Sequence, residues 1–456
     1  MGISNILFIV ILAGAAILFY RNLSQIVSNI KLGKDIDLSD NSSLRWKTMF
    51  RVALGQSKMV VRPIPGILHI LVYVGFVVIN IEILEIVIDG VFGTHRIFSG
   101  VLGSLYIPFI NLFEVLALLV LLSCAIFLVR RNIVRIPRFW NPEMKGWPAS
   151  DANYILILEV LLMSAFLFMD AADTALMNMN AEEMISQGMS KYVVPEMVGN
   201  QFTVSQFLVG MLPSDASSLM MIERICWWFH IIGILGFLNY LVISKHLHIL
   251  FAFPTTYYSN LKEKGELTNL ASVKKEVQLM FDPDADPYAA PPEPEGPPET
   301  FGAKDVLDLN WKQLLDSYSC TECGRCTSVC PANQTGKLLS PRKVMMDTRD
   351  RISEVGNVIK QKGKDFVVTD FNDGKTLVND YISSEELWAC TSCNACTDAC
   401  PINIDPLSII VDLRRYLVME QSAAPAELNG MFTNIENNGA PWQFAQADRL
   451  NWKDEA

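Results

Sequence analysis

Several features are scarce or absent in this sequence, and each absence argues against a class of protein. Lys and Arg together number 37 against 48 Asp and Glu, and the formal charge of −11 argues against a nucleic-acid-binding surface. No Gly-x-Gly-x-x-Gly loop, nucleophile dyad or flavin motif is present, so substrate chemistry is expected on another protein. Only five histidines occur among 456 residues, so a histidine with a special role stands out.

Cysteine, in contrast, occurs in a regular pattern. Eight of the ten cysteines form two runs, CTECGRCTSVCP from Cys320 to Pro331 and CTSCNACTDACP from Cys390 to Pro401. Each run has the Cys-x2-Cys-x2-Cys-x3-Cys-Pro spacing of bacterial ferredoxins, in which the fourth cysteine ligates the cluster of the other run. The spacing therefore predicts two [4Fe–4S] clusters with crossed ligand sets. One set is Cys320, Cys323, Cys326 and Cys400; the other is Cys390, Cys393, Cys396 and Cys330.

Two other interpretations of the cysteine runs are less favourable. Zinc sites use two separated cysteine pairs rather than runs of four. Disulfides belong to secreted proteins in oxidising compartments. The remaining cysteines, Cys124 and Cys226, lie in apolar surroundings and are interpreted as small buried hydrophobic residues.

The other prominent feature is a set of long apolar runs, consistent with a hydrophobic content of 51%. Each run is long enough to be a membrane helix or most of one. The first lacks a basic leader and a small-residue cleavage site, so we interpret it as an uncleaved helix. The five runs are Ile3–Tyr20, Ile64–Ile88, Leu105–Val129, Tyr154–Met169 and Ile225–Phe253.

Basic residues are distributed unevenly between the loops. They are numerous in residues 21–62 and 130–145, whereas residues 171–222 contain Lys191 as their only base. Because basic loops stay in the cytoplasm, the N-terminus is predicted outside and everything after Phe253 inside. The protein is therefore expected in the inner membrane, with its cysteine runs in the reducing compartment that iron–sulfur clusters need.

The expected fold is all-α: a five-helix transmembrane bundle followed by a cytoplasmic helical ferredoxin domain. Helices are predicted at Ser340–Ser353, Ser383–Leu387 and Pro406–Glu420, and a hairpin near Phe366–Lys375. The Pro- and acid-rich stretch Asp282–Thr300 is interpreted as an extended linker. The predicted domains are residues 1–255 (membrane), 256–300 (connector and linker), 301–422 (clusters) and 423–456 (tail).

The histidines predict a haem-binding bundle. His69 and His248 lie near the predicted cytoplasmic ends of the second and fifth helices, where both imidazoles could bind one b-type haem. The alternative for each is an interhelical hydrogen bond. His230 precedes His248 by five turns of a continuous helix, so it would face the same way about 27 Å further out. His246 would point about 200° away from His248, beside Lys245.

A second, outer haem on His230 needs another ligand. The second helix has no second histidine, and Asn80 stands near the expected position. His95, in the outer loop, is the alternative ligand. Three acidic residues within apolar helices, Glu82, Glu85 and Glu114, are predicted to exchange protons with quinone. For Glu82 and Glu85, structural pairing with Arg96 or Arg224 is the competing interpretation.

These motifs resemble a known group of proteins. The five helices with histidines, together with SKHLHI at Ser244–Ile249, are similar to the haem b γ-subunit of respiratory nitrate reductase. The paired cysteine runs resemble the C-subunit of heterodisulfide reductase. The whole chain is similar to membrane iron–sulfur oxidoreductases related to heterodisulfide reductase. That resemblance implies electron transfer to menaquinone from an electron-transfer flavoprotein or a thiol/disulfide system. The Cys-Cys-Gly repeats that often follow in the family are absent from this sequence.

The sequence therefore predicts a membrane-anchored electron-transfer subunit. Electrons would pass between a cytoplasmic partner and quinone through two [4Fe–4S] clusters and one or two haems. The expected partner carries Cys-Cys-Gly repeats or is an electron-transfer flavoprotein. The competing hypothesis is a membrane-anchored iron–sulfur sensor or scaffold that needs neither haem nor quinone.

Overall fold

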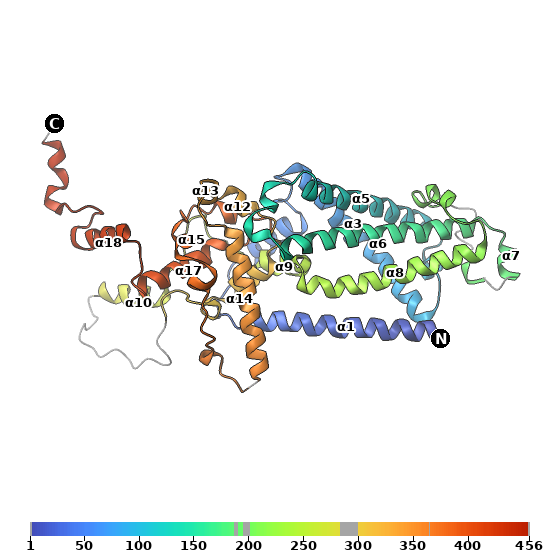
Figure 1. Cartoon of the computed structure of the whole chain (residues 1–456), viewed down its shortest axis with the longest axis horizontal. Helices are drawn as coiled ribbons and strands as arrows, with labels where there is room; N and C mark the ends of the chain where they lie inside the picture. Colours follow the sequence, from blue (N-terminus) through green and yellow to red (C-terminus); the bar gives the residue numbers. More distant parts are fainter. Residues whose placement is uncertain (1, 187–189, 195–200, 283–299, 364, 455–456) are drawn as a thin grey trace.

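The computed structural model describes residues 2–186, 190–194, 201–282, 300–363 and 365–454 (Figure 1). The described residues are mostly helical, and they contain two isolated β-bridges but no strand. Five long helices form one end of the molecule, and a compact group of shorter helices forms the other. The all-α class and this two-part order are confirmed.

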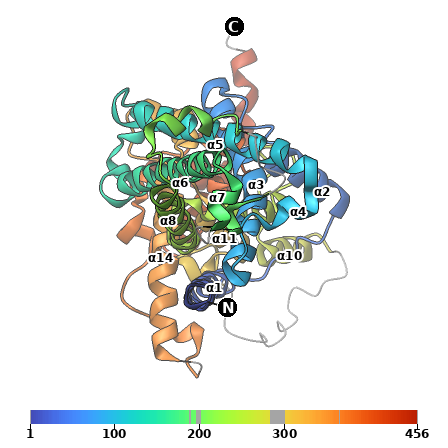
Figure 2. The same cartoon turned by 90° about the vertical axis from the view of Figure 1, so that its right-hand side faces the viewer.

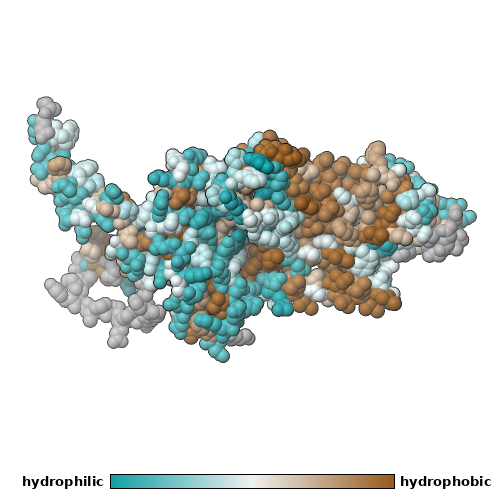
Figure 3. Space-filling view, in the orientation of Figure 1, coloured by the Kyte–Doolittle hydropathy of each residue, from teal (hydrophilic) through white to brown (hydrophobic). Residues whose placement is uncertain are grey.

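Among the described residues, five segments are long and apolar enough to cross a membrane. Around the bundle, α3 packs on α5, α5 on α6, α6 on α8, α8 on α1 and α1 on α3, so the helices form a closed ring (Figure 2). Their outer surface is an apolar belt, while both ends of the bundle are hydrophilic (Figure 3). The five segments are α1 (Ile3–Ile30), α3 (Pro63–Phe92), α4 with α5 (Ile97–Leu102 and Tyr106–Asn132), α6 (Trp147–Met177) and α8 (Ala216–Ile243).

The remaining helices lie in the loops of the bundle and in the C-terminal half. In the loops they are α2 (Ser42–Met49), α7 (Ala181–Ser186) and α9 (His248–Tyr257). After them come α10 (Ala271–Met280), α11 (Trp311–Ser319), α12 (Arg325–Val329), α13 (Pro331–Gln334), α14 (Pro341–Lys362), α15 (Ser384–Trp388), α16 (Ala395–Ala399), α17 (Pro406–Met419) and α18 (Ala426–Asn438). Most of the predicted linker, residues 283–299, lies outside the described residues.

The fifth predicted helix is broken, and the prediction of one helix over Ile225–Phe253 is wrong. α8 ends at Ile243, Ser244 is extended, and a 3-10 turn over Lys245–Leu247 leads into α9. The Ser244 side chain accepts a hydrogen bond from the His246 backbone N–H at 3.2 Å. Asp151 Oδ2 accepts another from the Lys245 N–H at 3.1 Å. These two caps satisfy backbone donors that an uninterrupted helix would have used.

The predicted hairpin near Phe366–Lys375 is also wrong. A 3-10 turn at Val368–Asp370 replaces it, with no strand among the described residues of 366–375. Arg351, whose side chain is fully buried, bonds to Asp373 at 2.6 Å and to Asp305 at 2.6 Å. This buried guanidinium holds the segment against α14, so side-chain ion pairs replace the cross-strand pairing that was expected.

The C-terminal helices pack directly on one end of the bundle. Asn29, in the last turn of α1, donates to the Tyr318 hydroxyl of α11 at 2.9 Å. The backbone of Lys34 exchanges hydrogen bonds with Leu309 and Trp311 at 2.8 and 3.0 Å. One hydrophobic core continues from Ile30 and the α8–α9 region into α11, α14 and α17. The two parts are therefore joined by a continuous interior.

The opposite end of the bundle contains a buried ionic network centred on Arg96. Its Nη1 lies 2.6 Å from Glu82 Oε1, and its Nη2 lies 2.8 Å from Asp173 Oδ2 and also contacts Asp170. Glu82, Asp170 and Asp173 belong to α3 and α6, so one guanidinium ties two helices together. The competing structural interpretation of Glu82, pairing with Arg96, describes what the structure shows.

Replacing Arg96 with glutamine should destabilise the bundle strongly. The side chains of Glu82 and Asp170 are fully buried, and removing one partner of such a network typically costs about 3–5 kcal/mol. The measurement is the unfolding transition of the purified protein in detergent. Arg21→Gln, on the exposed side of α1, is the control and should leave that transition unchanged. An Arg96 variant as stable as the control would contradict this role.

Candidate iron–sulfur and histidine sites

The two cysteine runs adopt the same local fold. Glu322 and Ser392 have positive φ, as do Gly324 and Asn394, so each loop turns twice through the left-handed region. A five-residue helix then follows in each run, α12 in the first and α16 in the second. A Cβ at Gly324 would lie 2.4 Å from Arg342 Nη1, so a larger residue at this left-handed position would displace the Arg342 side chain. The sequence repeat is therefore a structural repeat.

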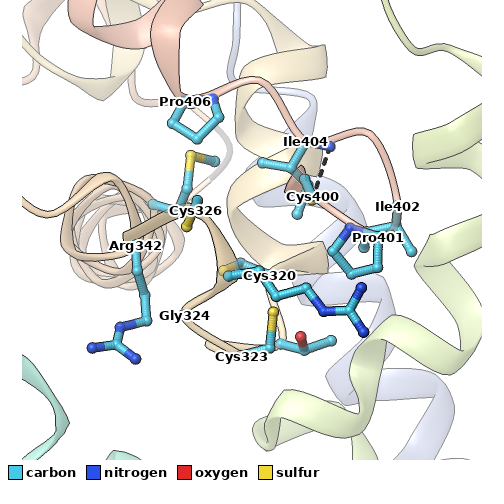
Figure 4. A pocket seen from close by; sticks show the side chains of 13 residues that line it. Cys320, Cys323, Gly324, Cys326, Arg342, Cys400, Pro401, Ile402, Ile404 and Pro406 are labelled. Carbon is cyan, nitrogen blue, oxygen red and sulfur yellow. Dashed lines mark hydrogen bonds between the residues drawn. The ribbon is translucent and has the colours of Figure 1, made fainter. Parts of the chain in front are cut away.

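The first cavity is lined by cysteines from both runs. Cys320, Cys323 and Cys326 come from the first run, and Cys400 reaches the same cavity from the end of α16 (Figure 4). α12 packs against α16, so the C-terminal end of each short helix is brought beside the loop of the other run. The backbone N–H of Ile404 donates to Cys400 Sγ at 3.3 Å. The chain thus gathers four thiol groups around one space, in the grouping that crossed ligation requires.

The second set reaches the surface at one of its four cysteines. Cys330, at the end of α12, is buried and acts electrostatically on Cys390, the first cysteine of the second run. Cys393 is exposed and lines a surface groove with Lys264 and Asp398. The two sets therefore differ in access: one is enclosed against the bundle and the other reaches solvent.

Burial raises the thiol pKa of Cys320, Cys326 and Cys400, which keeps these thiols protonated until a metal binds. It raises the pKa of Cys320 and of Cys400 to about 12. Iron binds thiolates, so these cysteines lose their protons only as the metal arrives. Four thiols around one cavity fit a [4Fe–4S] cluster, which is held by four cysteine thiolates.

A pair of histidines lies where the bundle meets the C-terminal helices. The ring centroids of His69 on α3 and His248 on α9 are 6.5 Å apart. His248 Nδ1 lies 2.9 Å from the Lys245 carbonyl oxygen, which assigns the ring proton to Nδ1 and leaves Nε2 free for a metal. His69 Nδ1 is buried without a hydrogen-bond partner among the described residues. Because a metal–imidazole bond is about 2 Å long, the separation leaves room for one iron between the rings.

The helix break also changes the expected position of His246. Its ring centroid lies 5.7 Å from that of His248 and 5.3 Å from that of Phe237, rather than on an opposite helix face. The predicted angle of about 200° assumed a continuous helix, so that prediction is wrong. The five-turn relation between His230 and His248 is wrong for the same reason. Three histidines, not two, meet at this end of the bundle.

The histidine pair and the first cysteine cavity are neighbours. Arg325 lines that cavity, and its charge acts on His69. Glu322, between the first two cysteines of the run, bonds to Lys245 at 2.7 Å, three residues before His248. Tertiary packing thus places the enclosed thiol set beside the two imidazoles. In the sequence, more than seventy residues separate each of these histidines from the cysteines.

The outer histidines are not brought together. His230 Nδ1 lies 3.0 Å from the Leu162 carbonyl oxygen, and its Nε2 is buried without a partner among the described residues. His95 Nε2 instead lies 3.4 Å from Asp173 Oδ1. Leu162 and Asp173 are both on α6, eleven residues or about 16 Å apart along the axis. Asn80, the other position considered, is exposed on the outer face of α3.

The other two acidic residues predicted to exchange protons are held by hydrogen bonds. Glu85 accepts from the Phe98 N–H at 2.7 Å and from the Tyr106 hydroxyl at 2.9 Å. Glu114 accepts from the Val204 N–H at 2.8 Å. Both carboxyl groups are buried near the Arg96 end of the bundle. The structure therefore places them at the end opposite the cysteine cavities.

Comparison with known proteins agrees with the cysteine geometry. Residues 319–404 match the family described as 4Fe-4S dicluster domain. The chain is 28% identical to the probable iron-sulfur-binding oxidoreductase FadF of Bacillus subtilis, over 99% of this chain and 61% of that protein. The chain is related to iron–sulfur oxidoreductases. The resemblance to this group that was drawn from the sequence is confirmed.

Two further relatives define the group. The chain is 26% identical to the EtfAB:quinone oxidoreductase of Syntrophomonas wolfei, over 92% of this chain and 55% of that protein. It is 30% identical to the C-subunit of the ferredoxin/F(420)H(2)-dependent CoB-CoM heterodisulfide reductase of Methanosarcina acetivorans, over 27% of this chain and 60% of that protein. The chain thus spans less than two thirds of the length of each relative. No solved structure matches it.

The arginines around the first cavity are residues that the sequence analysis missed. Arg325 and Arg342 line it, and the carbonyl oxygen of Arg138, in the loop after α5, accepts a hydrogen bond from Arg342 Nη1 at 2.6 Å. One local signal was available, because Arg325 lies inside the first run, where the second run has Ala395. No sequence signal connected Arg138 or Arg342 to the cysteines.

Proposed function

We propose that this chain passes electrons between a soluble redox partner and membrane quinone. The observation that carries the proposal is the position of the first cysteine cavity, directly beside the imidazoles of His69 and His248 at the end of an apolar helix bundle. Two [4Fe–4S] clusters and a haem b bound at these residues would each carry one electron at a time. The chain's own residues hold these groups in line between solvent and membrane.

The cysteines are proposed to bind in crossed sets. Cys320, Cys323, Cys326 and Cys400 would hold the cluster nearer the membrane, and Cys390, Cys393, Cys396 and Cys330 would hold the other. The grouping of the first four around one cavity supports the first assignment. The electrostatic contact of Cys330 with Cys390 supports the second.

For haem, the proposed axial ligands are His69 and His248. The hydrogen bond from His248 Nδ1 to the Lys245 carbonyl oxygen fixes the ring as a metal-binding imidazole normally is. His230, with its buried Nε2 that has no partner among the described residues, is the proposed ligand of a second, outer haem. His95 would complete that site only if its contact with Asp173 opened.

The proposed electron acceptor or donor in the membrane is menaquinone. Quinone reduction consumes protons, and Glu82, Glu85 and Glu114 are the proposed groups that exchange them. Their burial within the membrane-spanning part supports a functional role. The network with Arg96 supports the structural role as well, so the two roles are compatible for Glu82.

The proposed location is the inner membrane, with the iron–sulfur domain in the cytoplasm. The five spanning segments make the protein a membrane protein. The basic residues of the loops at the iron–sulfur end support a cytoplasmic orientation for that end. The proposed partner is an electron-transfer flavoprotein or a protein with Cys-Cys-Gly repeats. The similarity to an EtfAB:quinone oxidoreductase favours the flavoprotein.

The test is electron exchange by the purified chain alone. Menaquinol and artificial dyes should reduce its clusters and haem, while no soluble metabolite should be turned over until a partner is added. Absorption of haem b and electron paramagnetic resonance (EPR) of the clusters follow the electrons. The control is the same protein prepared from native membranes with any copurifying subunits.

Two outcomes would contradict this proposal. Metabolite turnover by the chain free of other subunits would show that it contains its own substrate site. Clusters without any haem and without reduction by menaquinol would favour a membrane-anchored sensor or scaffold.

A further inference from the structure

The two cysteine sets have different electrostatic surroundings. Basic side chains crowd the enclosed set, whose cavity Arg325 and Arg342 line directly. Arg138 acts electrostatically on Cys323, and Lys58 acts on Cys400. Lys58 Nζ donates to the Cys400 carbonyl oxygen at 3.2 Å. Four basic side chains therefore surround one group of four cysteines.

Part of this positive charge comes from the membrane domain. Lys58 and Arg62 lie in the loop before α3, and Arg138 lies in the loop after α5. Arg62 donates to Ser328 Oγ in α12 at 2.8 Å, and Arg325 donates to the Lys58 carbonyl oxygen at 2.8 Å. The same basic loops that predicted the topology thus contact the first cysteine run.

Among the described residues, the basic side chains around the first cavity outnumber the acidic side chains that pair with them. Glu322 is shared by Lys245 and Arg349, each at 2.7 Å, and Glu143 bonds to Arg342 at 2.6 Å. The Nε atoms of Arg138 and Arg342 are buried and have no hydrogen-bond partner in the described part of the chain. Two buried donors without acceptors beside this cavity fit a bound group that carries negative charge.

Repulsion among these groups points the same way. Burial and the neighbouring guanidinium of Arg62 lower the pKa of Arg138 to about 10. A [4Fe–4S] cluster with four thiolate ligands is an anion and gains a further negative charge on reduction. It would therefore relieve this repulsion, and more so in its reduced form.

The second set has less basic charge around it. Arg414 acts on Cys390, and it donates to the Leu387 carbonyl oxygen at 2.9 Å. Asp405 acts on Cys396 with the opposite sign. Asp398, beside Cys393, pairs with the exposed Lys264. Among the described residues, Arg414 and Asp405 oppose each other, so the surroundings of this set carry little net charge, and Cys393 is open to solvent.

We propose, on the basis of the proposed electron-transfer function, that the basic loops of the membrane domain raise the reduction potential of the Cys320–Cys323–Cys326–Cys400 cluster above that of the other cluster. Positive charge favours the more negative, reduced state, and net charge and solvent exposure are known controls of cluster potential. One electron would pass from the outer cluster to the inner one, so the outer cluster becomes oxidised and the inner cluster becomes reduced. No bond changes and no proton is required.

This arrangement gives the chain a preferred direction. A soluble donor protein would deliver an electron at the exposed Cys393 side, and the basic loops would draw it toward the histidine pair. Because part of the charge belongs to the membrane domain, the direction depends on the packing of the two parts. The basic residues of the membrane loops would therefore set the direction of electron transfer in addition to setting the membrane topology.

The test is an EPR-monitored redox titration of the full chain carrying Arg138→Gln. Loss of this charge should shift the electron equilibrium between the clusters at least tenfold toward the outer one, which is about 59 mV for a one-electron couple. Arg138→Lys keeps the charge and should restore most of the difference. Arg135→Gln, exposed in the same loop, is the matched control and should change neither potential. Lys58→Gln is a second variant and should shift the inner cluster in the same direction.

Specific results would overturn the proposal. One is an outer cluster whose reduction potential is the higher of the two in the native protein. The other is that the Arg138→Gln and Lys58→Gln variants retain both clusters but shift both potentials equally or not at all. Failure of the proposed function would look different. It would be an absence of haem or of reduction by menaquinol, observed independently of the potential difference between the clusters.

Discussion

Replacing either His69 or His248 with alanine is expected to remove one and the same haem. The two rings lie 6.5 Å apart on different elements, α3 and α9, so each variant would leave the iron with a single axial ligand. The measurement is the reduced-minus-oxidised absorption band of haem b, normalised to protein. Each variant should lose the full amplitude of that haem, and the double variant should lose no more than either single one.

The control for this experiment is His246→Ala. His246 lies 5.7 Å from His248 between ring centroids, yet the pair that spans α3 and α9 consists of His69 and His248. The His246 variant should therefore retain its haem. EPR signals from both clusters would show that each variant still folds. Haem loss in the His246 variant together with retention in the His248 variant would show that His246, not His248, is the ligand.

Replacing Cys400 with alanine is expected to eliminate the cluster of the first run, although Cys400 belongs to the second. Its thiol lines the cavity of Cys320, Cys323 and Cys326, so the inner cluster would lose one of its four ligands. Iron outside haem should fall from about eight to about four atoms per chain, since each cluster contains four. EPR should show that the remaining signals come from the outer cluster.

The reciprocal variant and a neutral one complete the test. Cys330→Ala should eliminate the outer cluster and retain the inner one. Cys226→Ala, outside both runs, should retain all the iron. If Cys400→Ala left both sets of EPR signals unchanged, the crossed assignment would have to be abandoned.

Local patterns in the sequence were sufficient for the elements and the fold class. Apolar runs predicted all five spanning helices, and α14, α15 and α17 begin within one residue of their predicted starts. The errors have identifiable causes. Apolar residues lie on both sides of the polar Ser244–Lys245–His246 and were interpreted as one run, which concealed the break at Ser244, whose side-chain cap was the available signal. The hairpin prediction failed because Arg351 of the preceding helix, α14, pairs with Asp373 in the segment, a contact that the local pattern does not show.

The sequence by itself determined which residues could bind metal and how many metal sites they could form. Spacing within a run is a local property, and eight cysteines in two identically spaced runs specify two sites of four whatever surrounds them. Apolar length is local too, because a helix must be long enough to cross a bilayer. The acidic total and the basic loops likewise required no knowledge of packing.

Sequence spacing predicted the crossed cysteine sets and the His69–His248 pair, but only the tertiary structure decided how these residues meet and which other side chains lie beside them. Packing of α12 against α16 brings Cys400 into the first cavity, and the break after α8 turns His248 toward His69. The packing of the membrane bundle against the cluster domain also brings three loop residues, Lys58, Arg62 and Arg138, close to that domain. The physical reason is that contacts between elements depend on side-chain shape and burial summed over the whole interior. A local pattern carries the chemistry of a residue but not the identity of its neighbours.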